Sequence, residues 1–282
     1  MSPASIQQPL HGLKVLSLAP NLPGPAAAAR LRDLGAAVTK LEAPGGDPMA
    51  GHNPAFYASL SAGMQVQGCD LKSAAGRAEL EGLLAVSDLL LTSSRVSALA
   101  RLGLTPERLA ADFPALCWVA VVGHEAPHGD RPGHDLTYQA EAGLIDPQQN
   151  GAGMPTSLLA DMAGAVLASE AALALLLGRS LGHAGRYREV SLAGAAEYLA
   201  LPRRFGLTAP GGLLAGRLPE YRLYPTSGGL LAVAALEPHF AAKLTGLLGD
   251  DLEAVFLTRS AAEWEAWAGE HDLPLVAIGP AD

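Results

Sequence analysis

Three side chains in this chain stand where proton-transfer chemistry could take place. His134 lies in a segment rich in Gly, Pro, His and Asp, residues 124–155, which is typical of a long loop with a short helix inside it. Asp161 begins the most apolar helical pattern, and Glu237 directly precedes Pro238. Histidine is a natural general base because its unperturbed pKa lies near neutral pH. A carboxyl group can act opposite it if the site allows it to be protonated.

Each of these residues also has a structural interpretation. His134 could be a loop histidine in a Gly/Pro turn. Asp161 could be a helix N-cap, which is an equally good physical use of that position. Glu237 could be an acid in the first turn of a helix, where it complements the helix dipole. Residue type and position alone leave both interpretations open.

Four cations are candidates for binding phosphate or adenine, because Lys and Arg supply charge-assisted hydrogen bonds to phosphate. They are Lys40, Lys72, Arg95 and Arg131. Single exposed cations are more often solvated surface residues. The net charge of −9 argues against a nucleic-acid partner, so a polyanionic ligand has to be held by a local cluster.

Several classes of protein are not indicated. Cys69 and Cys117 form no CxxC pattern, so we expect neither a disulfide framework nor a metal site, and a reducing compartment fits best. The first residues lack the basic and apolar regions of a signal peptide.

The longest apolar stretch, residues 162–178, is short for a membrane span and predicts a buried helix. No GxGxxG follows the first strand, so a nicotinamide dinucleotide is not indicated. We therefore expect a cytoplasmic protein without a membrane partner.

The elements that would position these residues alternate between strand and helix patterns. A buried strand at Leu13–Ala19, a helix from Pro25 to Gly35 and a strand at Ala37–Glu42 form a βαβ unit. The alternation then continues through Ala74–Ala85 (helix), Asp88–Leu91 (strand), Thr105–Asp112 (helix) and Leu116–Gly123 (strand). This pattern predicts an α/β fold with a Rossmann-like, doubly wound parallel sheet.

The pattern also predicts two domains. Residues 1–201 would form the large Rossmann-like domain, and residues 202–219, which contain Gly, Pro and Arg, would form a linker. Residues 220–282 would form a smaller α/β domain. Its predicted elements are two short strands within Glu220–Leu236, helices at Pro238–Leu248 and Ser260–His271, and a last strand at Leu275–Ile278.

Long stretches of the chain match one known family in order. They include PLHGLKVLSLAPNLPGPAAAARLRDLGAAVTKLEAPGGDP near the start, RPGHDLTYQAEAGL and LLADMAGAVLASEAALALLLGR in the middle, and PEYRLYPTSGGLLAVAALEPHF near the end. The chain resembles the family III CoA-transferases, the group that also contains α-methylacyl-CoA racemase. The resemblance covers nearly the whole chain.

The resemblance implies roles for particular residues. The GHD-LTY segment at Gly133–Tyr138 has the form found in the racemases, which makes His134 a catalytic residue. Asp161 stands where the family keeps its catalytic aspartate. Glu237, in ALEPHF, stands where the racemases have a glutamate beside the active site. The implied substrate is a coenzyme A thioester with no permanently bound cofactor, and the implied assembly is a homodimer.

The expected reaction is racemisation or epimerisation of 2-methylacyl-CoA thioesters. His134 and Asp161 would exchange the α-proton, Glu237 would orient His134 or relay protons, and backbone N–H groups at the helix start would stabilise the enolate oxygen. Coenzyme A would lie at the carboxyl ends of the strands, near Lys40, Lys72, Arg95 and Arg131. Alternatively, Asp161 could attack the thioester as a nucleophile and transfer coenzyme A between carboxylic acids. A third alternative is a non-catalytic protein with this fold, which a lack of CoA affinity would favour.

Overall fold

The structure is a computed structural model that describes residues 8–145 and 153–279. The chain divides into two compact units, Met1–Leu199 and Ala200–Asp282. Each unit has a sheet and a hydrophobic core of its own.

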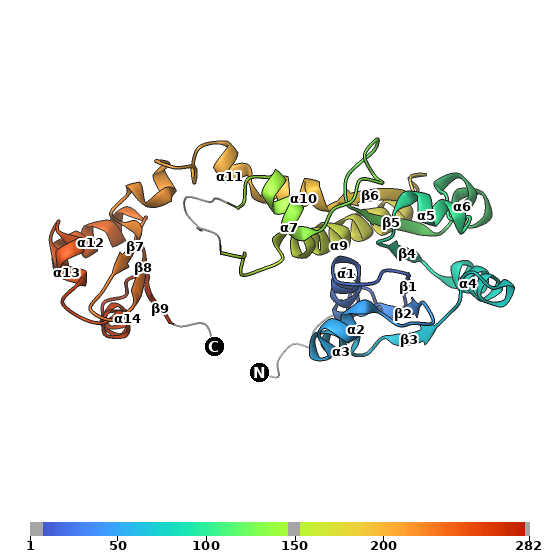
Figure 1. The fold of residues 1–282 in the computed structure, drawn as a ribbon, viewed down its shortest axis with the longest axis horizontal. Coiled ribbons are helices and arrows are strands. Elements are labelled where there is room, and N and C mark those ends of the chain that lie inside the picture. The colour runs from blue at the N-terminus through green and yellow to red at the C-terminus, as the bar shows by residue number, and fades with distance from the viewer. Residues whose placement is uncertain (1–7, 146–152, 280–282) are drawn as a thin grey trace. The chain divides into compact units, whose positions relative to one another are not determined.

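A six-stranded parallel sheet forms the centre of the first unit (Figure 1). Its strands follow the order β3 (Gln65–Gly68), β2 (Ala37–Glu42), β1 (Lys14–Ser17), β4 (Leu89–Thr92), β5 (Cys117–Val122) and β6 (Tyr187–Ser191). All neighbouring strands pair in parallel, and the direction of winding reverses between β1 and β4. The predicted α/β fold with a doubly wound parallel sheet is therefore confirmed.

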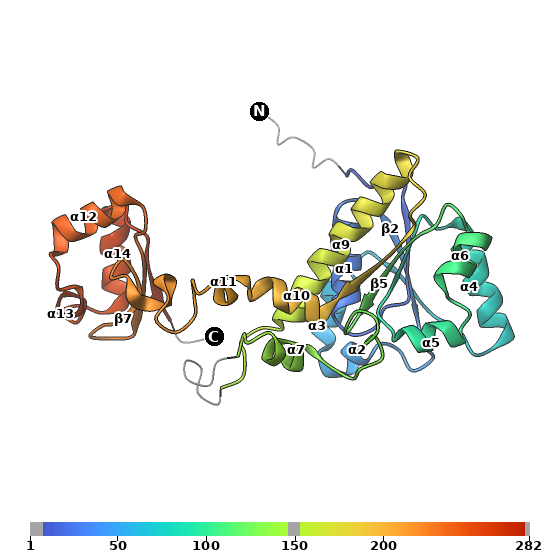
Figure 2. The same ribbon diagram turned by 90° about the horizontal axis from the view of Figure 1, so that it is seen from above.

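Helices cover both faces of this sheet (Figure 2). The unit contains α1 (Pro23–Asp33), α2 (Pro48–His52), α3 (Pro54–Ser61), α4 (Ala74–Val86), α5 (Val96–Arg101), α6 (Pro106–Asp112), α7 (Asp135–Glu141), α9 (Leu159–Ser180) and α10 (Leu192–Leu199). Side chains of β4 and β5 alternate between two cores, as expected for strands that are buried on both faces. Leu89 and Leu91 pack with α1 and α9 on one face, whereas Leu90 packs with α4, α5 and α6 on the other.

The first βαβ unit agrees with the sequence prediction at β2 and differs slightly at the helix. Helix α1 begins at Pro23 instead of Pro25, and Gly35 follows it with a φ of +103°. Gly24 lies against the loop after β1, where an added Cβ would approach the Ala19 Cβ to 2.1 Å. The close approach of loop and helix therefore requires glycine at this position.

Helix α9 is long and apolar enough to meet the length and composition criterion for a membrane span, with a mean hydropathy of 1.6. In the structure it packs against α1, α10, β5 and β6. Small residues such as Ala160, Ala165, Ala168 and Ala172 face the core and are fully buried. The prediction of a buried helix therefore holds for one face only, because Met162, Val166 and Leu177 on other faces are exposed.

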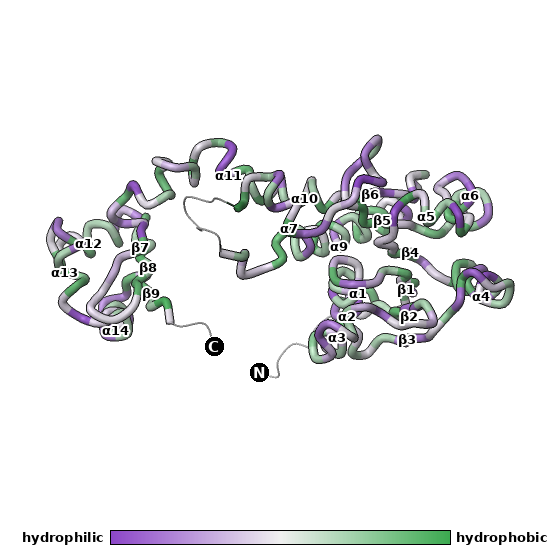
Figure 3. Tube along the Cα trace, in the orientation of Figure 1, coloured by the Kyte–Doolittle hydropathy of each residue, from purple (hydrophilic) through white to green (hydrophobic). Residues whose placement is uncertain are grey.

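The second unit is a three-stranded antiparallel sheet with helices. Its strands follow the order β7 (Tyr221–Pro225), β8 (Leu230–Ala234) and β9 (Leu275–Ile278), and β8 and β9 are hydrophobic (Figure 3). The helices are α11 (Leu201–Arg204), α12 (Pro238–Leu248), α13 (Leu252–Phe256) and α14 (Ala261–Glu270), and an irregular turn spans Leu213–Arg217. Tyr224, Phe256 and Trp264 form the centre of its core. Helix α11 and the turn lie in or next to the segment that the sequence suggested to be a plain linker.

Candidate active site

Two cavities open at the carboxyl ends of the parallel strands, next to the point where the winding reverses between β1 and β4. The His134 cavity has a volume of about 450 Å³ and is lined by the segments that follow β1, β4 and β5. The Lys40 cavity has a volume of about 620 Å³ and is lined by the segments that follow β1, β2 and β3. Pro20 and Ser94 line both cavities. Doubly wound sheets bind their ligands at this edge.

The structure brings four of the predicted site residues into the His134 cavity. They are Arg95, Arg131, His134 and Asp161. Lys40 and Lys72 line the neighbouring Lys40 cavity. Glu237 lies in the second unit, exposed to solvent, at the position just before α12. Its relation to His134 stays a prediction.

His134 directly precedes helix α7. Thr137 fixes the backbone here, because its hydroxyl accepts a hydrogen bond from the His134 N–H at 3.1 Å and donates one to the His134 carbonyl at 2.8 Å. The His134 residue is exposed and lines the cavity. The local turn therefore holds the backbone in place while the imidazole remains accessible to a ligand.

Asp161 lies in the first turn of α9 but is not its N-cap. Leu158 occupies the N-cap position, and it offers no side-chain hydrogen bond. Burial, followed by the negative charge of Asp135, raises the pKa of Asp161 from 3.8 to about 6. A carboxyl group with this pKa can both hold and release a proton near neutral pH. The structure thus argues against the purely capping role that the sequence left open.

Asp135 is a site residue that the sequence analysis missed. It is the first residue of α7 and is buried, and its Oδ1 accepts a hydrogen bond from the Asp161 backbone N–H at 3.0 Å. The carboxylate of one helix thereby caps the other helix. Its position directly after His134 was visible in the sequence, but its partner lies 26 residues further on.

Tyr138 forms a buried wall of the His134 cavity. Two glycines leave room for its ring. A Cβ on Gly133 would approach the Tyr138 Cε1 to 2.4 Å, and one on Gly123 would approach the Tyr138 hydroxyl to 2.4 Å. Burial, with the nearby charge of Asp161, raises the pKa of the Tyr138 hydroxyl. The ring therefore stays neutral at the pH values where Asp161 titrates.

Replacing Gly133 with alanine should destabilise the protein by about 1–3 kcal/mol, the usual cost of overpacking. The buried Tyr138 ring cannot move away without losing its own packing. Gly129→Ala is the matched control in the same loop, because an added Cβ there meets its nearest atoms only at 3.6 Å. Urea unfolding of both variants measures the difference. Equal stability of the two variants would contradict this account of Tyr138.

A further ionic cluster lies beside the cavity. Arg131 donates to Glu141 Oε1 at 2.6 Å, and His124 Nε2 lies 3.0 Å from Glu141 Oε2. The hydrogen bond from His124, together with the charge of Arg131, lowers the pKa of Glu141. The Arg131 charge is thus already paired, although the side chain remains half exposed.

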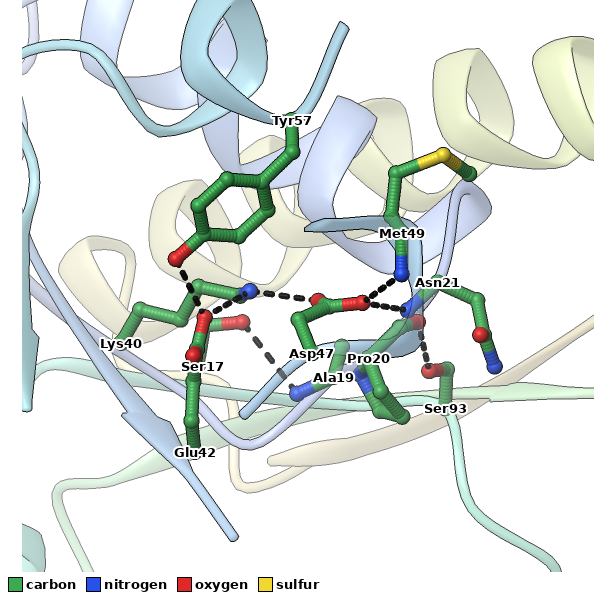
Figure 4. Close-up of polar contacts among 10 residues, drawn as sticks. All are labelled: Ser17, Ala19, Pro20, Asn21, Lys40, Glu42, Asp47, Met49, Tyr57 and Ser93. Atoms are coloured by element: carbon green, nitrogen blue, oxygen red, sulfur yellow. Dashed lines mark hydrogen bonds and ion pairs between the residues drawn. The ribbon is translucent and has the colours of Figure 1, made fainter. Parts of the chain in front are cut away.

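Lys40 is buried in an ionic network next to the shared wall of the two cavities (Figure 4). Its Nζ lies 2.5 Å from Glu42 Oε1 and 2.5 Å from Asp47 Oδ2, and the Tyr57 hydroxyl donates to Glu42 at 2.9 Å. Only 1% of the Lys40 side chain is exposed. The sequence suggested a surface lysine that contacts phosphate, whereas this ammonium group already has two anionic partners.

Asp47 connects this network to the loop after β1. Its Oδ1 accepts hydrogen bonds from the backbone N–H groups of Asn21 at 3.0 Å and Met49 at 2.9 Å (Figure 4). Asn21 has a φ of +66°, a left-handed conformation that is uncommon for residues other than glycine. Ser93 adds a hydrogen bond to the Pro20 carbonyl at 3.3 Å. The network therefore holds the loop that lines both cavities.

Comparison with known proteins gives the class to which this fold and site belong. The family profile described as CoA-transferase family III matches residues 10–263. The chain belongs to this family, and the resemblance seen in the sequence is confirmed.

Individual relatives extend this result. The mouse α-methylacyl-CoA racemase is 31% identical over 271 residues, which are 90% of this chain and 68% of the racemase. A probable fatty acyl-CoA transferase of Mycobacterium tuberculosis is 33% identical over 186 residues, 61% of this chain. The match covers 47% of that relative, about half its length. The crystal structure of a hypothetical protein from M. tuberculosis has a TM-score of 0.83 at 25% identity, covering 96% of this chain and 84% of the other.

Proposed function

We propose that this protein racemises or epimerises 2-methylacyl-CoA thioesters: one of His134 and Asp161 removes the α-proton, and the other delivers its own proton to the opposite face of the α-carbon. The observation that carries the proposal is that both side chains line one cavity from the starts of two helices. Inversion at the α-carbon needs a base on one face of the substrate and an acid on the other. An imidazole and a carboxyl group that can be protonated supply these two functions.

The protonation behaviour of Asp161 supports this role. With a pKa of about 6, the carboxyl group has both of its forms accessible near neutral pH. It can therefore accept the α-proton in one direction and return it in the other. Thioester polarisation would come from backbone N–H groups at the helix starts, which favour developing negative charge. Glu237 would orient His134 or relay its proton, as in the racemase-like interpretation of the sequence.

We propose that coenzyme A occupies the Lys40 cavity and reaches the His134 cavity past Pro20 and Ser94, which line both. Lys72 and Arg95 are exposed at these cavities and would contact the phosphates. Arg131 would contribute less because it is paired with Glu141. Lys40 would affect coenzyme A binding indirectly, because its ion pairs with Glu42 and Asp47 hold the wall of this cavity in place.

The decisive test is α-proton exchange by the full chain. The protein is incubated with 2-methylacyl-CoA in deuterated water, and deuterium at the α-carbon is followed by NMR. We expect deuterium to enter and the two α-carbon configurations to interconvert. Exchange that is lost in His134→Ala would assign the histidine to proton transfer. Measurable CoA binding without exchange would contradict the proposal.

A second candidate function is transfer of coenzyme A between carboxylic acids, favoured by the similarity to the M. tuberculosis relative named as a transferase. Asp161 would attack the thioester carbonyl and form an acyl–aspartyl anhydride, and the CoA thiolate would leave. The thiolate would then attack the Asp161 carbonyl of the anhydride, which gives an aspartyl-CoA thioester and releases the donor acid. An acceptor carboxylate would displace CoA from that thioester to form a second anhydride, and the thiolate would attack its acyl carbonyl to give the acceptor's CoA thioester and free Asp161. This reaction predicts ping-pong kinetics and an acyl-enzyme visible by mass spectrometry, whereas α-proton transfer predicts neither. Absence of both exchange and CoA affinity would favour a non-catalytic protein.

A further inference from the structure

Two carboxyl groups lie at the junction of α7 and α9. Asp135 accepts the hydrogen bond from the Asp161 backbone N–H through Oδ1 at 3.0 Å. Its other oxygen, Oδ2, accepts a hydrogen bond from Gln139 Nε2 at 2.5 Å. Both Asp135 oxygens therefore act as acceptors, which is the hydrogen-bonding pattern of an ionised carboxylate.

The surroundings of Gln139 fix this pattern. Gln139 is buried, and its Nε2 also donates to the Ser157 carbonyl at 3.1 Å. Both hydrogens of the amide nitrogen are thus used, one by Asp135 and one by Ser157. Turning the amide over would place its oxygen against two acceptors. Among the described residues, Asp135 therefore faces a hydrogen-bond donor at each of its two oxygens.

Asp161 is in the opposite situation. Its carboxyl group is partly buried, and the structure gives it no hydrogen bond that would stabilise its charge among the described residues. The negative charge that the start of α9 favours is already supplied by Asp135, which caps that helix through the Asp161 N–H. A buried carboxyl group that lacks such a hydrogen bond and lies near a second negative charge retains its proton to higher pH.

We propose that Asp135 is a positioning residue with two effects on the site. Its carboxylate joins the start of α7 to the first turn of α9, which fixes the separation of His134 and Asp161. Its negative charge also keeps a proton on Asp161. The inference rests on the proposed function in one respect, namely that Asp161 acts as an acid–base group. The protonation of Asp161 can be measured without substrate.

Other charged and titratable groups face Asp161 from the elements around the cavity. They are His52 of α2, Arg95 at the start of α5, Arg131 and His134 in the segment before α7, and Tyr138 of α7. Among the charged groups near Asp161, Asp135 is the one whose charge raises its pKa, and burial is the larger cause of the shift. Removing the charge of Asp135 leaves these groups in place, so the proton on Asp161 should be held less tightly.

The test is a carbon-13 NMR titration of the Asp161 carboxyl group in the full chain. The Asp161 signal is assigned as the one that is absent from the spectrum of Asp161→Asn. We expect Asp135→Asn to lower the Asp161 pKa from about 6 toward the ordinary 3.8. The value should stay above 3.8, because burial is the larger cause of the shift. Gln139→Ala removes one of the two donors to Asp135 but keeps the carboxyl group itself, so it should lower the Asp161 pKa less than Asp135→Asn does.

Asp130→Asn is the control for loss of one acidic charge, because Asp130 is exposed and has no part in the Asp161 shift. An unchanged Asp161 pKa in Asp135→Asn would overturn the proposal, as would an equal fall in Gln139→Ala. If Asp135→Asn does not fold, the wild-type titration decides, since an Asp161 carboxyl group that titrates at the ordinary 3.8 contradicts the inference.

The helix connection has its own readout. In Asp135→Ala the Asp161 amide loses its acceptor, so its hydrogen exchange should accelerate relative to amides later in α9. An unchanged rate would show that Asp135 does not hold the two helices together. Neither readout uses a CoA substrate, so failure of this inference and failure of the proposed function remain distinguishable.

Discussion

Asp161→Asn should reduce the interconversion of the two α-carbon configurations by about 10²–10⁴-fold, the usual contribution of a positioned general acid or base. Asparagine preserves the shape of the side chain and the backbone N–H that binds Asp135, but it cannot accept or return the proton. The measurement is the rate at which one α-carbon configuration of 2-methylacyl-CoA converts to the other at saturating substrate, because His134 can still exchange the α-proton on its own face. CoA affinity should change little, because the variant removes chemistry at the reacting carbon and not a phosphate contact.

The same variant provides its own folding control. The folded-state pKa of Asp161, about 6, lies above the ordinary 3.8, so the folded protein binds this proton more tightly than the unfolded chain. A destabilising effect of the buried anion therefore develops as pH rises from about 4 to 6. Asp161→Asn should consequently melt at a higher temperature than the wild type at pH 7.5, with the difference shrinking toward pH 4. Interconversion of the two configurations that persists within tenfold of wild type in this folded variant would rule out the acid–base role.

The fold could be predicted from the sequence where a local residue pattern marks a helix or a strand. Strand β2, helix α12 and strand β9 have the predicted bounds, because apolar runs and a leading proline mark them within a few residues. Strand β3 was missed since its sequence, QVQG, is mostly polar and lies at the edge of the sheet. Helices α2 and α3 were also missed, although Asp-Pro and Asn-Pro pairs mark their starts.

The candidate site was predictable in residue type but not in its connections. The sequence suggested His134 and Asp161 from a family pattern, and the structure places both in one cavity. The bond from Asp161 to Asp135 joins positions 26 residues apart, with no periodic signal between them. Lys40 shows the same limit, because a rule that lysines are exposed cannot anticipate two carboxylates around one ammonium group.

Lys40→Met should destabilise the protein by about 3–5 kcal/mol, the typical effect of removing one partner from a buried ion pair. Methionine has a similar length but leaves the carboxylates of Glu42 and Asp47 close together without a cation. Asp47 is fully buried, so water cannot replace the ammonium group without opening the structure. Urea unfolding at pH 7.5 measures the effect.

Lys72→Met is the matched control, because Lys72 lines the same cavity but is exposed. If both lysines were simple phosphate contacts, the two variants would lose CoA affinity similarly and unfold alike. The buried network instead predicts opposite profiles: Lys72→Met weakens CoA binding with little change in stability, whereas Lys40→Met mainly loses stability. Adding Asp47→Asn to Lys40→Met should recover part of that loss, since one uncompensated charge is removed and the acceptor for the Asn21 and Met49 N–H groups can be kept. No recovery would mean that the network does not hold the loop after β1 through charge pairing.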